Sequence, residues 1–124
     1  MPFFEYKGYI KDINVLLRNV DIACLPSYRE GLSKFLIEAG ASGKPIVTTD
    51  VPGCREVVEN GENGFVVPVK NAMALSEAIA TLCLDKTKRE YMGKASRRMI
   101  EKHFSMNSVV EKIITVYKNF ENIK

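Results

Sequence analysis

The stretch SYREGLSKFLIEAGASGKP (residues 27–45) lies between the two segments that decide the fold. Before it, residues 21–27 (DIACLPS) form an apolar run closed by a proline, which is typical of a buried strand. After it, residues 45–50 (PIVTTD) are rich in β-branched side chains and predict a second strand. The apolar pattern between them predicts a helix that stops at Gly-Lys-Pro. Strand, helix and strand in this order are typical of a parallel βαβ unit.

The rest of the chain continues this alternation. Residues 3–10 and 64–69 are predicted strands, and residues 13–19 are a predicted short helix. Residues 54–60 are predicted to form one or two helical turns, in preference to a hairpin over residues 57–67, where Asn-Gly occurs twice. Three C-terminal helices are predicted to start at Asn71, at Asp85 and after Ser105 or Asn107. We therefore predict an α/β fold, a Rossmann-like parallel sheet of about four strands with C-terminal helices.

The composition is that of a soluble globular domain, because 46% of the residues are hydrophobic and 27% are charged. A chain of 124 residues can build one core and no linker divides it, so we expect residues 1–124 to form a single domain. The formal charge of +3 is too small to indicate nucleic-acid binding. The basic residues between 86 and 102 are interpreted as a solvated helix face, with peripheral contact to an anionic membrane as the functional alternative.

Cysteine and histidine usage indicates reduced thiols and no metal site. The three cysteines form no C-x-x-C pair, and the single histidine, His103, cannot complete a metal set. We therefore expect neither a metal nor a bound cofactor. The N-terminal sequence lacks the pattern of a signal peptide, and no apolar run approaches the roughly 20 residues that span a bilayer, so we expect a cytoplasmic protein.

The loop that leaves the first strand of the βαβ unit is the candidate binding site, because ligands of open α/β sheets bind beyond the carboxyl ends of the strands. Gly31 allows a tight turn and Ser33 can cap the helix, whose first N–H groups then suit a phosphate. Glu38 lies about five residues into the helix, roughly 7 to 8 Å beyond that phosphate, where a carboxylate can accept two ribose hydroxyls. Glu30, on the loop, can accept hydrogen bonds from a second sugar. The alternative is a purely structural interpretation, in which the glutamate is a solvated surface residue, Ser33 only caps the helix and Gly31 only forms a turn.

Residues 25–69 carry an ordered set of motifs: Pro-Ser, Glu-Gly, Glu-Ala, small-Gly-x-Pro, Gly-x-x-Glu-Val-Val and Asn-Gly-x-x-Val-Pro. With these motifs the chain resembles the C-terminal, donor-binding half of the GT-B-type retaining glycosyltransferases of family four, or group 1, which use nucleotide sugars. The resemblance covers nearly the whole chain. It implies a hexosyltransferase-type enzyme of polysaccharide biosynthesis that recognises a nucleoside diphosphate sugar, with a UDP-sugar favoured.

The resemblance also implies roles for single residues. The family has two acids with seven residues between them, and these acids match Glu30 and Glu38. In the family the first, a catalytic residue, contacts the hydroxyls of the donor sugar near the reacting carbon, and the second holds the ribose hydroxyls. Ser33 replaces the usual proline of the family and is compatible with a helix cap. The positions that border the nucleobase and the diphosphate match Tyr9, Ile10, Gly31, Leu32, Ser33 and Lys34.

The family further implies parts that this sequence does not contain. These are the N-terminal acceptor domain and the first units of the donor domain, with a basic pair that neutralises the leaving diphosphate. We therefore expect a partial donor-binding domain that is inactive alone and has a missing N-terminal domain in another chain as its partner. The alternatives are a non-catalytic nucleotide-sugar binding module and an inert remnant. We also expect residues 3–10 to pair directly with residues 21–25, or two chains to share that strand edge.

Overall fold

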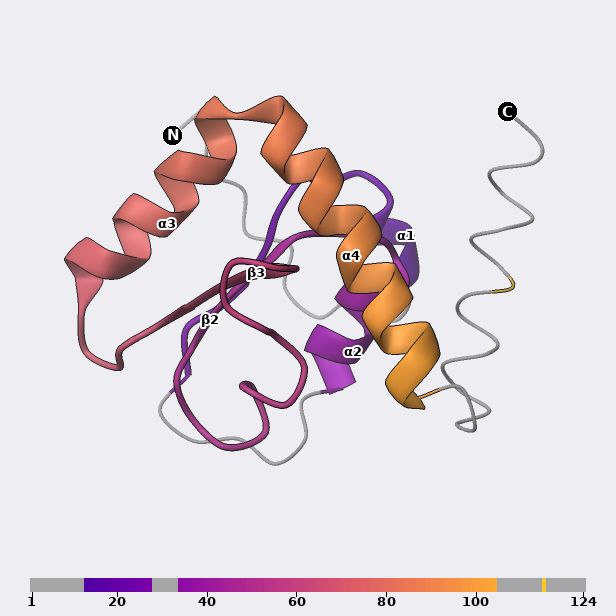
Figure 1. The fold of residues 1–124 in the computed structure, drawn as a ribbon, viewed down its shortest axis with the longest axis horizontal. Helices are drawn as coiled ribbons and strands as arrows, with labels where there is room; N and C mark the ends of the chain where they lie inside the picture. The colour runs from indigo at the N-terminus through magenta and orange to yellow at the C-terminus, as the bar shows by residue number, and fades with distance from the viewer. Residues whose placement is uncertain (1–12, 28–33, 105–114, 116–124) are drawn as a thin grey trace.

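The computed structural model describes residues 13–27, 34–104 and 115 (Figure 1). The predicted strand at residues 3–10 and the helix predicted after Ser105 lie outside the described residues, and so does the proposed pairing of residues 3–10. The elements are α1 (Ile13–Leu17), β1 (Ala23–Leu25), α2 (Lys34–Ala41), β2 (Ile46–Thr49), β3 (Gly64–Val67), α3 (Ala72–Leu84) and α4 (Lys86–Phe104).

The three described strands form one parallel sheet in the order β1-β2-β3. Cys24 pairs with Val47 and Val47 pairs with Phe65, so each strand lies beside the next one in the sequence. Helix α2 connects β1 to β2, which confirms the βαβ unit and the predicted α/β class. The described residues contain three strands where about four are predicted, and the remaining predicted strand, at residues 3–10, lies outside them.

Strand β2 is the central strand, and its four residues are all buried. Burial on both faces is typical of parallel sheets whose connections carry helices. Successive side chains of β2 point to opposite faces, so Ile46 and Val47 enter different core clusters. The β-branched residues of β2 therefore contribute side chains to both hydrophobic cores.

Helices cover both faces of the sheet (Figure 1). On one face α1 and α2 bury apolar side chains against β1, β2 and the segment after β2, with a core that includes Leu17, Leu36, Ile37, Ile46 and Val57. On the other face α3 buries its apolar stripe, with a core formed by Val47, Val67, Ala78, Leu82 and Met92. Leu75 and Ile79 of α3 pack against the same core from partly buried positions.

Helix α4 joins the two cores, because Met92 belongs to one cluster and Ile100 to the other. Glycines allow this close approach. A Cβ built on Gly93 would lie 2.3 Å from the carbonyl oxygen of Gly43, in the turn between α2 and β2. A Cβ on Gly40, in α2, would lie 2.5 Å from Cγ1 of Ile100. Helix α4 is therefore packed directly against the α2–β2 connection.

The ends of α3 and the start of α4 are fixed by side chains. The amide oxygen of Asn71 accepts from the Ala74 N–H at 2.9 Å, and the carboxylate of Asp85 accepts from the Lys88 N–H at 2.9 Å, so both predicted starts are confirmed. The Arg89 guanidinium donates to the last carbonyls of α3, on Leu82 and Cys83, at 2.8 Å each. Arg89, one of the basic residues predicted to form a solvated face, thus caps the C-terminal end of α3.

The segment after β2 differs from the prediction of helical turns. It forms consecutive turns over residues 52–57 and no regular helix. Gly53 has a φ of 90°, which interrupts a right-handed helix, and the Glu56 carboxylate accepts from the Gly53 N–H. The hairpin alternative is also wrong, since β3 runs parallel to β2. Asn63 instead anchors the turn through its buried amide, which donates to the Val57 carbonyl at 3.0 Å.

Candidate functional site

The carboxyl ends of the three strands meet at one edge of the sheet, where a hollow of about 370 Å³ opens. It extends from the end of β1 across β2 and β3 to the start of α3. Its lining consists of Pro26, Thr49, Val67, Pro68, Lys70, Asn71, Ala72 and Leu75. In open α/β sheets this is the edge at which ligands bind.

Helix α2 brings two of the predicted site residues together. It begins at Lys34, and Glu38 follows one turn later on the same face. The Lys34 ammonium lies 3.9 Å from the Glu38 carboxylate. The Lys34 side chain is 79% exposed, whereas that of Glu38 is only 11% exposed. The ammonium of Lys34 and the carboxylate of Glu38 therefore lie side by side in the first turns of α2.

Glu38 is not the solvated surface residue of the alternative interpretation. With its backbone included it is 8% exposed, and it lies in a helix whose residues 36–41 are all buried. A buried carboxylate loses hydration and has to be compensated by polar or charged partners. The ion pair with the exposed Lys34 is long, and such pairs contribute little to stability.

The other predicted site residues are outside the described part of the chain. They are Tyr9, Ile10, Glu30, Gly31, Leu32 and Ser33. The structure therefore tests neither their positions nor their assigned contacts. It does describe the two ends between which residues 28–33 run, Ser27 after β1 and Lys34 at the start of α2.

Two threonines of β2 at this edge were missed by the sequence analysis. The Thr48 hydroxyl donates to the Leu25 carbonyl at 2.8 Å. The Thr49 hydroxyl accepts from the Ser27 N–H at 2.9 Å and donates to the Ser27 carbonyl. In the sequence these threonines predict only a strand, because a pattern of residue types does not show which backbone groups their hydroxyls will meet.

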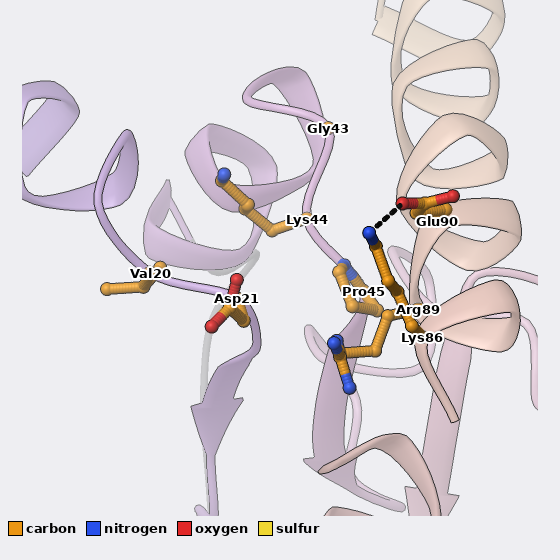
Figure 2. A pocket seen from close by; sticks show the side chains of 8 residues that line it. All are labelled: Val20, Asp21, Gly43, Lys44, Pro45, Lys86, Arg89 and Glu90. Atoms are coloured by element: carbon orange, nitrogen blue, oxygen red, sulfur yellow. Dashed lines mark ion pairs between the residues drawn. The ribbon is translucent and has the colours of Figure 1, made fainter. Parts of the chain in front are cut away.

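A second pocket, of about 180 Å³, lies near the opposite edge, where the chain enters β1 and β2 (Figure 2). Its lysines and arginine come from the α2–β2 connection and from α4, and Asp21 and Glu90 offset their charge. Lys86 pairs with Glu90 at 3.9 Å, and Arg89 is engaged by the end of α3. This balance of charges makes it a weaker candidate for an anionic ligand than the carboxyl edge.

The described residues contain no group of three or more His, Cys, Asp or Glu side chains that could hold a metal ion. His103 is exposed near the end of α4. The three cysteines are free, and burial raises the pKa of the Cys24 thiol. Over the same described residues no helix is long and apolar enough to cross a membrane.

The sequence profile of a family described as glycosyl transferases group 1 matches residues 3–99. Among curated relatives, the capsular polysaccharide biosynthesis glycosyltransferase CapM of Staphylococcus aureus is 33% identical over 112 residues, 90% of this chain and 30% of the relative. An N,N'-diacetylbacillosaminyl-diphospho-undecaprenol alpha-1,3-N-acetylgalactosaminyltransferase of Campylobacter jejuni is 37% identical over 114 residues, 91% of this chain and 30% of that protein. The chain thus spans about 30% of the length of these relatives.

Solved structures give the same fold. Anabaena HepE in complex with UDP superposes with a TM-score of 0.77 at 24% identity, over 95% of this chain and 32% of that one. A glycosyltransferase from Rickettsia africae superposes with a TM-score of 0.74 at 27% identity, over 90% of this chain and 30% of its own.

Proposed function

The chain belongs to the glycosyl transferases group 1 family, and on this basis we propose that it binds a nucleoside diphosphate sugar, with a UDP-sugar favoured. In this proposal residues 1–124 are one partial donor-binding domain of a retaining transferase. The observation that carries the proposal is the burial of Glu38 in α2, the helix that follows β1. An anionic nucleotide and a buried carboxylate are compatible when the acid faces hydroxyl groups rather than phosphate.

Glu38 is assigned to the ribose in this arrangement. A carboxylate has only acceptor sites, and two vicinal hydroxyls supply two donors to it. Hydrogen bonds to an ionised group are shorter and stronger than neutral ones. The two ribose hydroxyls would thus add charge-assisted hydrogen bonds to a carboxylate that is only 11% exposed.

The start of α2 is assigned to the diphosphate. The first N–H groups of a helix have no partners within it, and the helix dipole is positive at this end. Lys34 adds an exposed ammonium at the same place. The backbone of residues 31–34 is proposed to face the phosphates, Tyr9 and Ile10 to border the base, and Glu30 to face the transferred sugar.

We do not expect transfer by this chain alone. The proposed partner is an N-terminal glycosyltransferase domain in another chain, which would supply the acceptor site, and the positive charge on the leaving diphosphate would come from the first units of the donor domain. Loss of one such preorganised group commonly costs about 10²-fold in rate. That HepE was solved with UDP is a fact about that protein and supports UDP as the first nucleotide to test.

The test is calorimetric titration of the chain with UDP, GDP and ADP, with and without a metal chelator. Glu38→Gln keeps the volume of the side chain and removes its charge, so UDP binding should weaken about tenfold or more, the equivalent of one charged hydrogen bond of about 1.5 kcal/mol. Glu77→Gln, an exposed change on α3, is the matched control and should leave binding unchanged. UDP binding by Glu38→Gln as tight as that of the wild type would show that Glu38 does not hold the ribose.

A further inference from the structure

The pairing of β1 with β2 ends at Leu25 and Thr48, and the residue that follows β1 is Pro26. Ala23 donates its N–H to the Pro45 carbonyl, so alternate residues from Ala23 onwards turn their backbone groups towards β2. Ser27 is therefore the next residue whose backbone groups can bond to β2, and its N–H is bound by a side chain, the Thr49 hydroxyl.

The side chain of Thr49 takes over where the backbone pattern stops. Its hydroxyl accepts from the Ser27 N–H at 2.9 Å and donates to the Ser27 carbonyl at 2.5 Å, so both backbone groups of Ser27 are bound by one oxygen. A hydroxyl has a single proton to donate, and here that proton is used within the protein. Thr49 is 5% exposed and lines the hollow at the carboxyl edge.

The adjacent residue supports the same segment. The fully buried Thr48 donates its hydroxyl to the Leu25 carbonyl at 2.8 Å. Residues 25–27 are thus held to β2 by side chains at both ends of the tripeptide. The side chains of Thr48 and Thr49 point to opposite faces of the sheet, as those of neighbours in a strand do. Residues 25–27 are therefore held to β2 from both faces.

We propose that Thr49 is a positioning residue of the donor site, which fixes the point at which the chain leaves β1 for the start of α2. This inference rests on the proposed function, since it assumes that a nucleotide binds at the start of α2. Residues 28–33 connect Ser27 to Lys34, and they carry Glu30. Thr49 lines the hollow at the carboxyl edge, and its hydroxyl holds the backbone of Ser27, the residue from which the chain continues towards the start of α2.

The variants Thr49→Val and Thr49→Ser separate positioning from packing. Valine keeps the β-branched shape but has no hydroxyl, whereas serine keeps the hydroxyl and loses a methyl group. Thr81→Val is the matched control, because the Thr81 hydroxyl also donates to a backbone carbonyl, that of Glu77 at 2.8 Å, on the exposed side of α3. Thr49→Ala removes the same hydroxyl and gives the same readout if Thr49→Val does not fold.

Two measurements are made on each folded variant: UDP affinity by calorimetry and hydrogen exchange of the Ser27 amide. For Thr49→Val we expect about tenfold weaker UDP binding with unchanged stoichiometry, and exchange of the Ser27 amide at least about tenfold faster, as for the loss of the one hydrogen bond that this amide donates. Thr49→Ser should stay within about twofold of the wild type in both, and Thr81→Val should match the wild type.

The outcomes distinguish this inference from the proposed function. If the wild type binds UDP and Glu38→Gln binds it more weakly, but Thr49→Val binds like the wild type, Thr49 has no positioning role. Equal loss of affinity in Thr49→Ser and Thr49→Val also overturns the inference, because the hydroxyl would then be irrelevant. A wild-type chain that binds no nucleotide overturns the proposed function, and this inference with it.

Discussion

Replacing Gly93 by alanine should destabilise the protein, although alanine favours helices. Gly93 lies inside α4, where alanine in place of glycine contributes about 1 kcal/mol to helix stability. The added Cβ, however, would lie 2.3 Å from the carbonyl oxygen of Gly43. That oxygen belongs to the backbone and cannot move to another rotamer, so either α4 or the α2–β2 turn has to shift.

The expected size follows from these two opposing effects. Overpacking of a close contact costs about 1–3 kcal/mol, and a clash with backbone belongs near the upper limit. After subtraction of the gain in helix propensity, the free energy of unfolding should fall by about 2 kcal/mol. For a domain of this size such a loss lowers the melting temperature by about 8 °C.

Urea denaturation followed by far-UV circular dichroism measures this change. Gly40→Ala is the matched comparison, because its Cβ meets the side chain of Ile100, which can adjust, and the net loss should be no more than about 1 kcal/mol. Lys94→Ala, an exposed change beside Gly93, should shift stability by less than about 0.5 kcal/mol. A Gly93→Ala variant as stable as the wild type, or more so, would refute the close approach of α4.

Three further changes test other contacts. Gly64→Ala would place a Cβ 1.8 Å from the Ile46 carbonyl oxygen, so we expect a loss above about 3 kcal/mol in the free energy of unfolding, measured by denaturation, and a mild effect would contradict the β2–β3 register. Arg89→Met removes two hydrogen bonds to the end of α3 and should cost about 1–2 kcal/mol in the same assay, whereas no loss would mean that these bonds are dispensable. Burial raises the pKa of the Cys24 thiol, so a smaller fraction of this thiol is ionised at pH 8. Iodoacetamide at pH 8 should therefore label Cys24 more slowly than the exposed Cys83, and equal rates would contradict the burial.

The arrangement of helices and strands was predictable where one local signal dominates. The βαβ unit follows from two β-branched or apolar runs around a helix, and the starts of α3 and α4 follow from Asn71 and Asp85, whose caps need only neighbouring residues. The turns after β2 were mispredicted because Gly53 adopts a positive φ there, a conformation that composition permits but does not require.

The candidate site was less accessible to sequence reasoning, because its contacts join distant segments. The burial of Glu38 cannot be read from the pattern of α2, since residues 36–41 are all buried and no polar face remains to reveal which side is covered. The hydrogen bonds of Thr49 to Ser27 depend on which residues face each other where β1 ends. A pattern of residue types gives the strand but not its neighbour, so only the assembled sheet indicates this role.

The strand order also bears on how the chain folds. Ala23 pairs with Ile46 and Ile46 pairs with Gly64, so only residues 24–45 and 47–63 lie between successive partners. Closing loops of such modest length costs little entropy, and each doubling of length adds only about 0.6 kcal/mol. During synthesis on the ribosome, β1, α2, β2 and β3 are complete before α4 has been made. The nascent chain can therefore assemble its sheet first, and α4 closes both cores when it emerges.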